Sequence, residues 1–168
     1  MPLIPRRRKR NWDEQPVEPC DVMLAGDGRR RFSQRAIAQA VALSTSGPVT
    51  VVTIARIHGT QFGLPNPGLM PTKQEMKARH DWVGHGVDAI LAAGGAADGQ
   101  VAVTRKTTKT LARIARTRDV KTIVIDETQY TGWRRFVEGD VGTELAKRLR
   151  ADGVEVIVIP YDPNDPKP

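Results

Sequence analysis

The chain of 168 residues contains 39% hydrophobic and 27% charged residues, a balance typical of one soluble globular domain with a real core. It has no run of about 18 apolar residues, and no apolar segment follows the basic N-terminus, so we expect neither a membrane span nor a secretory signal. The single cysteine, Cys20, excludes a framework of internal disulfides and predicts a cytoplasmic protein. Cys20 is either a catalytic thiol or, as we favour, a lone thiol before a strand.

The net charge of +7 is concentrated at the N-terminus, where residues 1–10 contain five cations and no acid. The five are Arg6, Arg7, Arg8, Lys9 and Arg10. They belong to a Pro-containing arm, residues 1–19, that shows no apolar period. Such an arm prefers polyanions, namely RNA, DNA or an anionic lipid surface. The alternative is a solvated tail that only aids solubility.

The globular domain is expected over residues 20–160, and its first half alternates strands and helices. Residues 22–25 form an apolar run typical of a strand that is buried on both faces. Ser33 is a predicted N-cap, and the helix that follows has its apolar face at Ala36, Ile37, Ala40 and Val41. The β-branched run at residues 49–55 predicts the second strand, and a loop rich in Gly and Pro follows over residues 57–71.

Thr72 and Glu75 form a capping-box pattern that opens the second helix. We expect its buried stripe at Met76, Val83, Val87, Ile90 and Leu91. The later elements are a strand at 100–104, a helix at 107–118, a strand at 121–125, a helix after Gly139 and a strand at 154–159, and a Pro-rich tail covers residues 161–168. This β-α alternation predicts a five-stranded parallel sheet in a doubly wound α/β sandwich.

Two polar segments follow strands that such a fold brings to one edge of the sheet. Gly26-Asp27-Gly28 follows the first strand, and Asp126-Glu-Thr-Gln129 follows the fourth. Nine residues separate Gln129 from Gly139-Asp140, where the last helix begins. Ligands of doubly wound folds bind beyond the carboxyl ends of the strands, so these segments predict a binding site.

At these residues the chain resembles the universal stress protein family over roughly residues 21–160. Asp27-Gly28 with Ser33 and Ala36 is similar to the family's opening segment, and Asp126, Gln129, Gly139 and Asp140 match the spacing of its Gly-x-x-Gly, nine residues, Gly-Ser/Thr motif. The resemblance implies a five-stranded parallel α/β sandwich, an ATP or AMP site and a homodimer formed through the last strand. The implied nucleotide contacts are Gly26, Asp27, Gly28, Ile54, Asp126, Gln129, Gly139, Asp140 and Val141.

The residues at three of the motif positions depart from the family pattern. Asp126 and Gln129 replace glycines that let backbone N–H groups approach a phosphate, and Asp140 replaces the hydroxyl residue. A carboxylate at a helix N-terminus satisfies the N–H groups itself and repels a phosphate, at a cost of about 4 kcal/mol for unit charges ~4 Å apart at an effective dielectric near 20. We therefore expect weak or absent ATP binding.

Basic and aromatic side chains leave several alternatives open. Arg29, Arg30, Arg31, Arg134 and Arg135 either hold phosphates or, as we favour, neutralise Asp126, Glu127 and Asp140 as surface ion pairs. Lys106, Lys109, Arg113 and Arg116 form either an RNA-facing stripe or a solvated helix face. Tyr130 and Trp133 stack on a base or pack the loop. His58, His80 and His85 lack the spacing of a metal site.

These features predict a non-catalytic binding protein of the stress response, with altered or lost ATP binding, that acts through a protein or nucleotide partner. The alternative is an RNA- or ribosome-associated adaptor anchored by the basic arm. No motif for a nucleophile, a metal or a P-loop is found in the sequence, so we expect no enzymatic activity.

Overall fold

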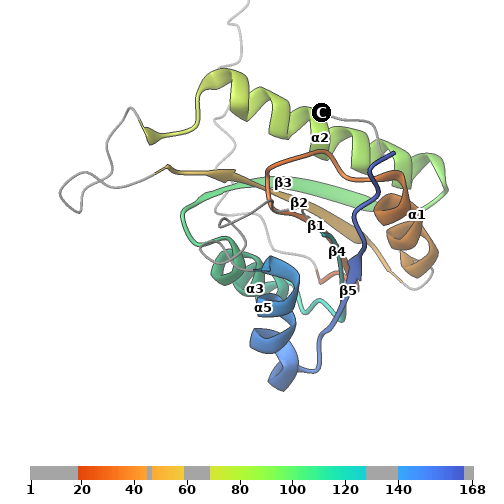
Figure 1. Ribbon diagram of the computed structural model, residues 1–168. Coiled ribbons are helices and arrows are strands. Elements are labelled where there is room, and N and C mark those ends of the chain that lie inside the picture. Colours follow the sequence, from red (N-terminus) through yellow and green to blue (C-terminus); the bar gives the residue numbers. More distant parts are fainter. Residues whose placement is uncertain (1–18, 45–46, 59–68, 128–139, 165–168) are drawn as a thin grey trace, which may run out of the picture.

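The computed structural model describes residues 19–44, 47–58, 69–127 and 140–164 (Figure 1). In chain order the elements are β1 (Val22–Gly26), α1 (Gln34–Leu43), β2 (Val49–Arg56), α2 (Lys73–Ala92), β3 (Ala97–Thr104), α3 (Thr107–Thr117), β4 (Thr122–Asp126), α5 (Val141–Leu149), the 3-10 turn η4 (Arg150–Asp152) and β5 (Glu155–Ile159). No helix among these residues is long and apolar enough to cross a membrane.

The five strands form one parallel sheet in the order β3-β2-β1-β4-β5. Helices α1 and α2 cover one face of this sheet, and α3 and α5 cover the other (Figure 1). The predicted doubly wound sandwich is confirmed. The chain builds outward from β1 to β3 on one side and then continues at β4 on the other, so the switch point in strand order lies between β1 and β4.

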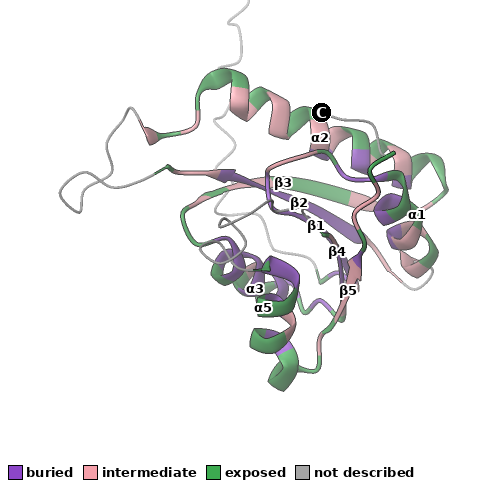
Figure 2. Cartoon of the chain, in the orientation of Figure 1, coloured by how far each residue is buried: buried purple, intermediate pink, exposed green. Residues whose placement is uncertain are grey.

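The core lies on both faces of the central strands, as the burial colours of Figure 2 show. Every residue of β1 is buried, and every residue of β2 except Arg56 is buried. Side chains alternate between the faces. Met23 and Ala25 pack in the cluster under α3 and α5, whereas Val22 and Leu24 pack in the cluster under α1 and α2.

The predicted helix starts are confirmed by their capping hydrogen bonds. The Ser33 hydroxyl accepts the N–H of Ala36 at 3.1 Å. The Thr72 hydroxyl accepts the N–H of Glu75 at 3.2 Å, and the Glu75 carboxylate accepts the N–H of Thr72 at 2.7 Å, which completes the capping box. Hydrogen bonding to Thr72, first of all to its backbone N–H, lowers the pKa of Glu75.

Two expectations about the edge of the domain were wrong. β3 begins at Ala97 and not at Gln100. The added residues have low strand propensity, but Gly99 suits this edge strand, because a Cβ there would lie 2.3 Å from Val83 Cγ1 of α2. Leu91 is 49% exposed, since the buried stripe of α2 runs through Val83 and Ile90 and leaves Leu91 beside it.

Candidate functional site

The predicted site residues of β1, β2 and β4 meet at the carboxyl edge of the sheet, at the switch point. Gly26 ends β1, Asp126 ends β4, and Asp27 and Gly28 follow β1 directly. Gly28 has a φ of +81°, and a Cβ there would lie 1.7 Å from the carbonyl oxygen of Ile54 in β2. The turn after β1 lies directly against β2, so only glycine fits at position 28.

The carboxylate of Asp126 is bound by the N-terminus of α1. The backbone N–H of Ser33 donates to Asp126 Oδ2 at 2.9 Å, and the Ser33 hydroxyl donates to Oδ1 at 2.5 Å. An Nη of Arg30 lies 3.6 Å from the same carboxylate and donates to the carbonyl oxygen of Glu127 at 3.1 Å. The Asp126 side chain is only 6% exposed. A carboxylate of the protein therefore takes the place where a doubly wound fold usually offers donors to an anion.

The turn after β1 is held by three guanidinium groups. Asp27 is buried, and its carboxylate accepts the N–H of Arg29 at 3.0 Å and lies 3.5 Å from the Arg29 side chain. Arg56, at the end of β2, donates to the carbonyl oxygen of Asp27 at 3.3 Å. Arg79 of α2 donates to the carbonyl oxygen of Gly28 at 2.8 Å. These arginines bind the protein's own carboxylates and carbonyl oxygens.

Asp140 and Val141 stand at the start of α5. The Asp140 carboxylate accepts the N–H of Gly142 at 3.0 Å and the hydroxyl of Thr143 at 2.5 Å, so it caps the helix as the sequence predicts. Val141 is buried, and a Cβ on Gly142 would lie 2.8 Å from Val158 of β5. The first N–H groups of α5 thus face a carboxylate of their own helix.

Several predicted residues lie outside the described part of the chain. They are Arg6, Arg7, Arg8, Lys9, Arg10, Gln129, Tyr130, Trp133, Arg134, Arg135 and Gly139. Their roles stay predictions. Of the described arginines in the same group, Arg31 is exposed, whereas Arg29 and Arg30 are partly buried. The expected surface ion pairs of Arg29 and Arg30 are therefore semi-buried contacts at the switch point.

Sequence reasoning missed three contributors to this cluster, namely Arg56, Arg79 and Tyr161. Arg79 also lies 4.6 Å from the ring centroid of Trp82, and Arg30 lies 5.2 Å from that of Tyr161. Arg56 directly follows the predicted second strand, so the strand pattern alone could have predicted its position at the carboxyl edge of the sheet. No local pattern points Arg79 or Tyr161 toward Gly28 or Arg30, because both contacts depend on how distant segments pack.

Cys20 has the surroundings of a structural thiol. It is 2% exposed, and burial raises its pKa to about 11. A buried thiol that stays protonated at neutral pH is not a nucleophile. Among the described residues, no group of three or more His, Cys, Asp or Glu side chains is placed to hold a metal ion.

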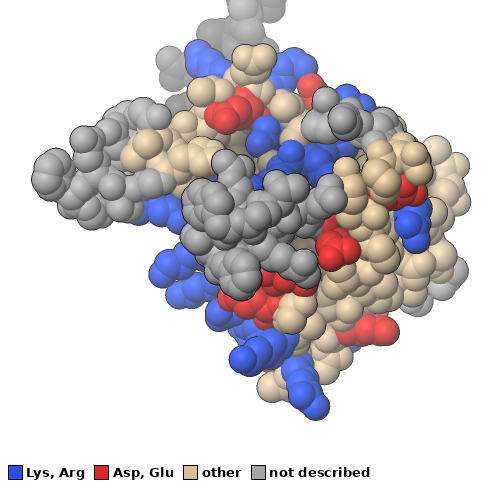
Figure 3. Space-filling model, viewed as in Figure 1, with Lys and Arg blue, Asp and Glu red and all other residues tan. Residues whose placement is uncertain are grey.

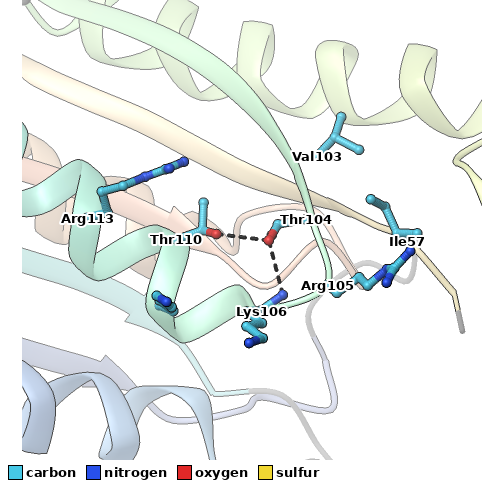
Figure 4. A pocket seen from close by; sticks show the side chains of 8 residues that line it. Ile57, Val103, Thr104, Arg105, Lys106, Thr110 and Arg113 are labelled. Carbon is cyan, nitrogen blue, oxygen red and sulfur yellow. Dashed lines mark hydrogen bonds between the residues drawn. The ribbon is translucent and has the colours of Figure 1, made fainter. Parts of the chain in front are cut away.

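The four cations of the expected stripe, of which Lys106 directly precedes α3 and the others lie on it, divide into two sets. Arg116 forms an ion pair with Asp152 at 2.8 Å, so a carboxylate of the protein balances its charge. Lys106, Lys109 and Arg113 instead line a surface pocket, together with Arg105 (Figure 4).

Comparison with solved structures identifies the same architecture elsewhere. The universal stress protein of Archaeoglobus fulgidus is 17% identical, with 84% of this chain and 94% of that chain covered at a TM-score of 0.60. Its complex with dAMP gives 18% identity, coverage of 86% and 99%, and a TM-score of 0.56. A universal stress protein family member from Burkholderia pseudomallei gives 18% identity, coverage of 88% and 100%, and a TM-score of 0.58.

No protein-family model matches the chain, and no curated protein matches it. At these identities the likeness to solved structures establishes architecture, and the predicted resemblance is confirmed at that level. The chain has the fold of the universal stress proteins.

Proposed function

We propose that this chain is a non-catalytic binding protein that uses the universal stress protein fold without the usual nucleotide at its switch point. The observation that carries the proposal is the Asp126 carboxylate, which accepts both the N–H and the hydroxyl of Ser33. A phosphate at this edge would face that carboxylate and the capping carboxylate of Asp140. The structural neighbour from Archaeoglobus fulgidus is in complex with dAMP, so dAMP is the proper probe.

Isothermal titration calorimetry with dAMP tests this proposal. We expect a dissociation constant weaker than about 1 mM, because negative side chains occupy the anion position. Binding at micromolar concentration would show an intact nucleotide site and would overturn the proposal. Incubation with ATP, followed by a phosphate-release assay, should give no hydrolysis above the rate without protein.

A function without a switch-point nucleotide requires a partner, which we propose to be a protein or a second copy of this chain in the cytoplasm during stress. The apolar strand β5 is the proposed dimer edge, because Val156, Ile157 and Val158 are only partly buried. Sedimentation equilibrium gives the oligomeric state. A monomer at all concentrations, together with no co-purified protein, would contradict this part.

The charge of the arm favours a second function, that of an RNA- or ribosome-associated adaptor. Five of the net positive charges lie at Arg6, Arg7, Arg8, Lys9 and Arg10. Deletion of residues 1–11 should abolish sedimentation with ribosomes, and binding of the full chain should fall steeply as salt rises. Unchanged sedimentation of the truncated chain would rule out the arm as the anchor.

A further inference from the structure

A pocket of about 410 Å³ opens on the surface between the end of β3 and α3. Figure 4 shows it around the turn that joins these two elements. Its volume lies within the usual range of small-molecule sites, about 300–1,000 Å³. The pocket is therefore large enough for a small ligand.

Four cations line this pocket, namely Arg105, Lys106, Lys109 and Arg113. All four residues are exposed, and among the described residues no carboxylate lines the pocket. Within the part of the chain that the structure describes, none of the four has an ion pair. Four positive charges that line one pocket with no carboxylate among the described lining residues repel one another, and an anion in the pocket relieves this repulsion.

Two cations near the pocket, unlike the four that line it, form ion pairs with carboxylates. Arg116, on the next turn of α3, pairs with Asp152, and Arg118 binds Asp98 at 2.6 Å. The unmatched charge on α3 thus ends at the pocket and does not continue down the helix. Figure 3 shows that Asp and Glu side chains lie beside the Lys and Arg side chains on the flank formed by α3 and α5. A compact anion fits this confined charge better than a long polymer, which needs a continuous track of cations.

Hydroxyl groups supply directional donors beside the charges. The Thr104 hydroxyl accepts the N–H of Lys106 at 3.0 Å and the hydroxyl of Thr110 at 2.9 Å. Because the Thr104 and Thr110 hydroxyls share one hydrogen bond, one of their two hydrogens remains for a further acceptor. A phosphate oxygen is such an acceptor, and hydrogen bonds to it are charge-assisted.

Two of the residues that line the pocket are apolar. Val103 is 42% exposed, and Ile57 directly follows β2. These side chains offer contact area to an apolar or aromatic body that carries the phosphates.

We propose that this pocket binds a small ligand that carries two or more phosphate groups. Arg105, Lys106, Lys109 and Arg113 hold the phosphates, and Val103 and Ile57 contact the body of the ligand where it has one. Two sources share this chemistry, inorganic polyphosphate and nucleoside polyphosphates. None of the residues that line the pocket is among the described residues that contact Asp27, Gly28 or Asp126, so the proposal does not depend on the absence of a nucleotide at the switch point.

Calorimetric titration of the full chain with tripolyphosphate, ATP and AMP tests the proposal. We expect tripolyphosphate and ATP to bind and AMP to bind at least about tenfold more weakly, because each phosphate adds charge-assisted contacts. Tighter binding of ATP than of tripolyphosphate would assign the nucleoside source, and equal binding would assign the inorganic one. No binding of either would overturn the proposal.

Substitutions locate the ligand. The Lys109→Gln, Arg113→Gln double variant should weaken binding by up to about 25-fold, since each lost cation removes up to about 1 kcal/mol from an exposed contact, or about fivefold in affinity. Lys109→Arg, which keeps the charge, should bind as the unaltered chain does. Lys147→Gln is the matched control, because Lys147 is exposed on α5 and does not line the pocket.

Three further outcomes show whether the ligand binds in the pocket, at the switch point or through general charge. An equal loss in the Lys147→Gln variant would show a general charge effect and would overturn the proposal. Binding of an RNA oligonucleotide without binding of tripolyphosphate would also overturn it. If ATP binding survives the double variant and dAMP binds as well, the switch point is a working nucleotide site, and it is the proposed function that fails.

Discussion

Asp126 at the end of β4 receives two hydrogen bonds from Ser33, the residue that caps α1. The same Ser33 hydroxyl accepts the N–H of Ala36, so one serine joins the helix start to the sheet edge. This contact closes the switch point and joins segments 93 residues apart in the sequence.

Asp126→Ala should lower the free energy of unfolding by about 2–4 kcal/mol. The loss follows because the variant leaves the nearly buried Ser33 N–H and hydroxyl, together with Arg30, without the Asp126 carboxylate. Urea denaturation followed by circular dichroism measures the change. Glu127→Ala is the control, since Glu127 is exposed, and should stay within about 0.5 kcal/mol. Equal midpoints for the two variants would contradict the role assigned to Asp126.

Two glycines should respond in opposite directions to alanine. Gly28→Ala should cost more than about 3 kcal/mol or prevent folding, because its Cβ would collide with the Ile54 carbonyl oxygen at a positive φ. Gly84→Ala should instead raise stability by about 0.5–1 kcal/mol, because Gly84 lies inside α2 with nothing within 4 Å of its Cβ position. Thermal melts of both variants check the pair. A tolerated Gly28→Ala would show that the turn does not lie against β2.

Arg118 and Asp98 form an ion pair with unequal partners. Arg118 is 10% exposed and also donates to the Thr50 hydroxyl at 2.9 Å, whereas Asp98 is 52% exposed. Asp98→Ala removes the carboxylate from a nearly buried guanidinium and should cost about 2–3 kcal/mol. Arg118→Met removes the charge and keeps the apolar stem, so it should cost less, about 1 kcal/mol. Chemical denaturation measures the free energy of unfolding of both variants. A larger loss in Arg118→Met than in Asp98→Ala would contradict the unequal roles of the two partners.

The Cys20 thiol should resist modification in the folded protein. Its pKa is raised to about 11 by burial, so at pH 8 it is protonated as well as inaccessible. A thiol-reactive disulfide reagent should label it only at the rate of unfolding, and rapidly in denaturant. Labelling of the native chain as fast as that of the unfolded chain would contradict the burial of this thiol.

The same shift predicts a loss of stability at alkaline pH. An unfolded thiol ionises near pH 8.5, about where free cysteine does, whereas the folded one ionises near pH 11. Between these values the unfolded state binds fewer protons, so the contribution of Cys20 to stability is complete below the lower value and is lost as the pH rises toward the upper one. Cys20→Ala should lack this part of the alkaline loss in denaturation curves measured from pH 8 to pH 11. An identical pH dependence in both proteins would contradict the raised pKa.

The sequence predicts those parts of this fold that depend on neighbouring residues. Ser33 and Thr72 are visible as caps because their partners lie three positions away. β1 and β2 are visible because all of their residues except Arg56 are apolar or β-branched. The first residues of β3 are not, because Gly99 is chosen for the close approach of Val83 and not for strand propensity. The contact of Arg79 with Gly28 depends on where α2 lies over the turn after β1, and no short pattern records that position.

The central position of β1 also has a consequence for how the chain folds. Val22 pairs with Val49 on one side and with Thr122 on the other, so the middle of the sheet closes only when the two ends of a long segment meet. Contacts between residues far apart in the sequence cost more loop entropy and slow folding. We expect the pairing of β1 with β2 to precede that of β1 with β4. A ribosome would therefore have to release most of the chain before the switch point can assemble.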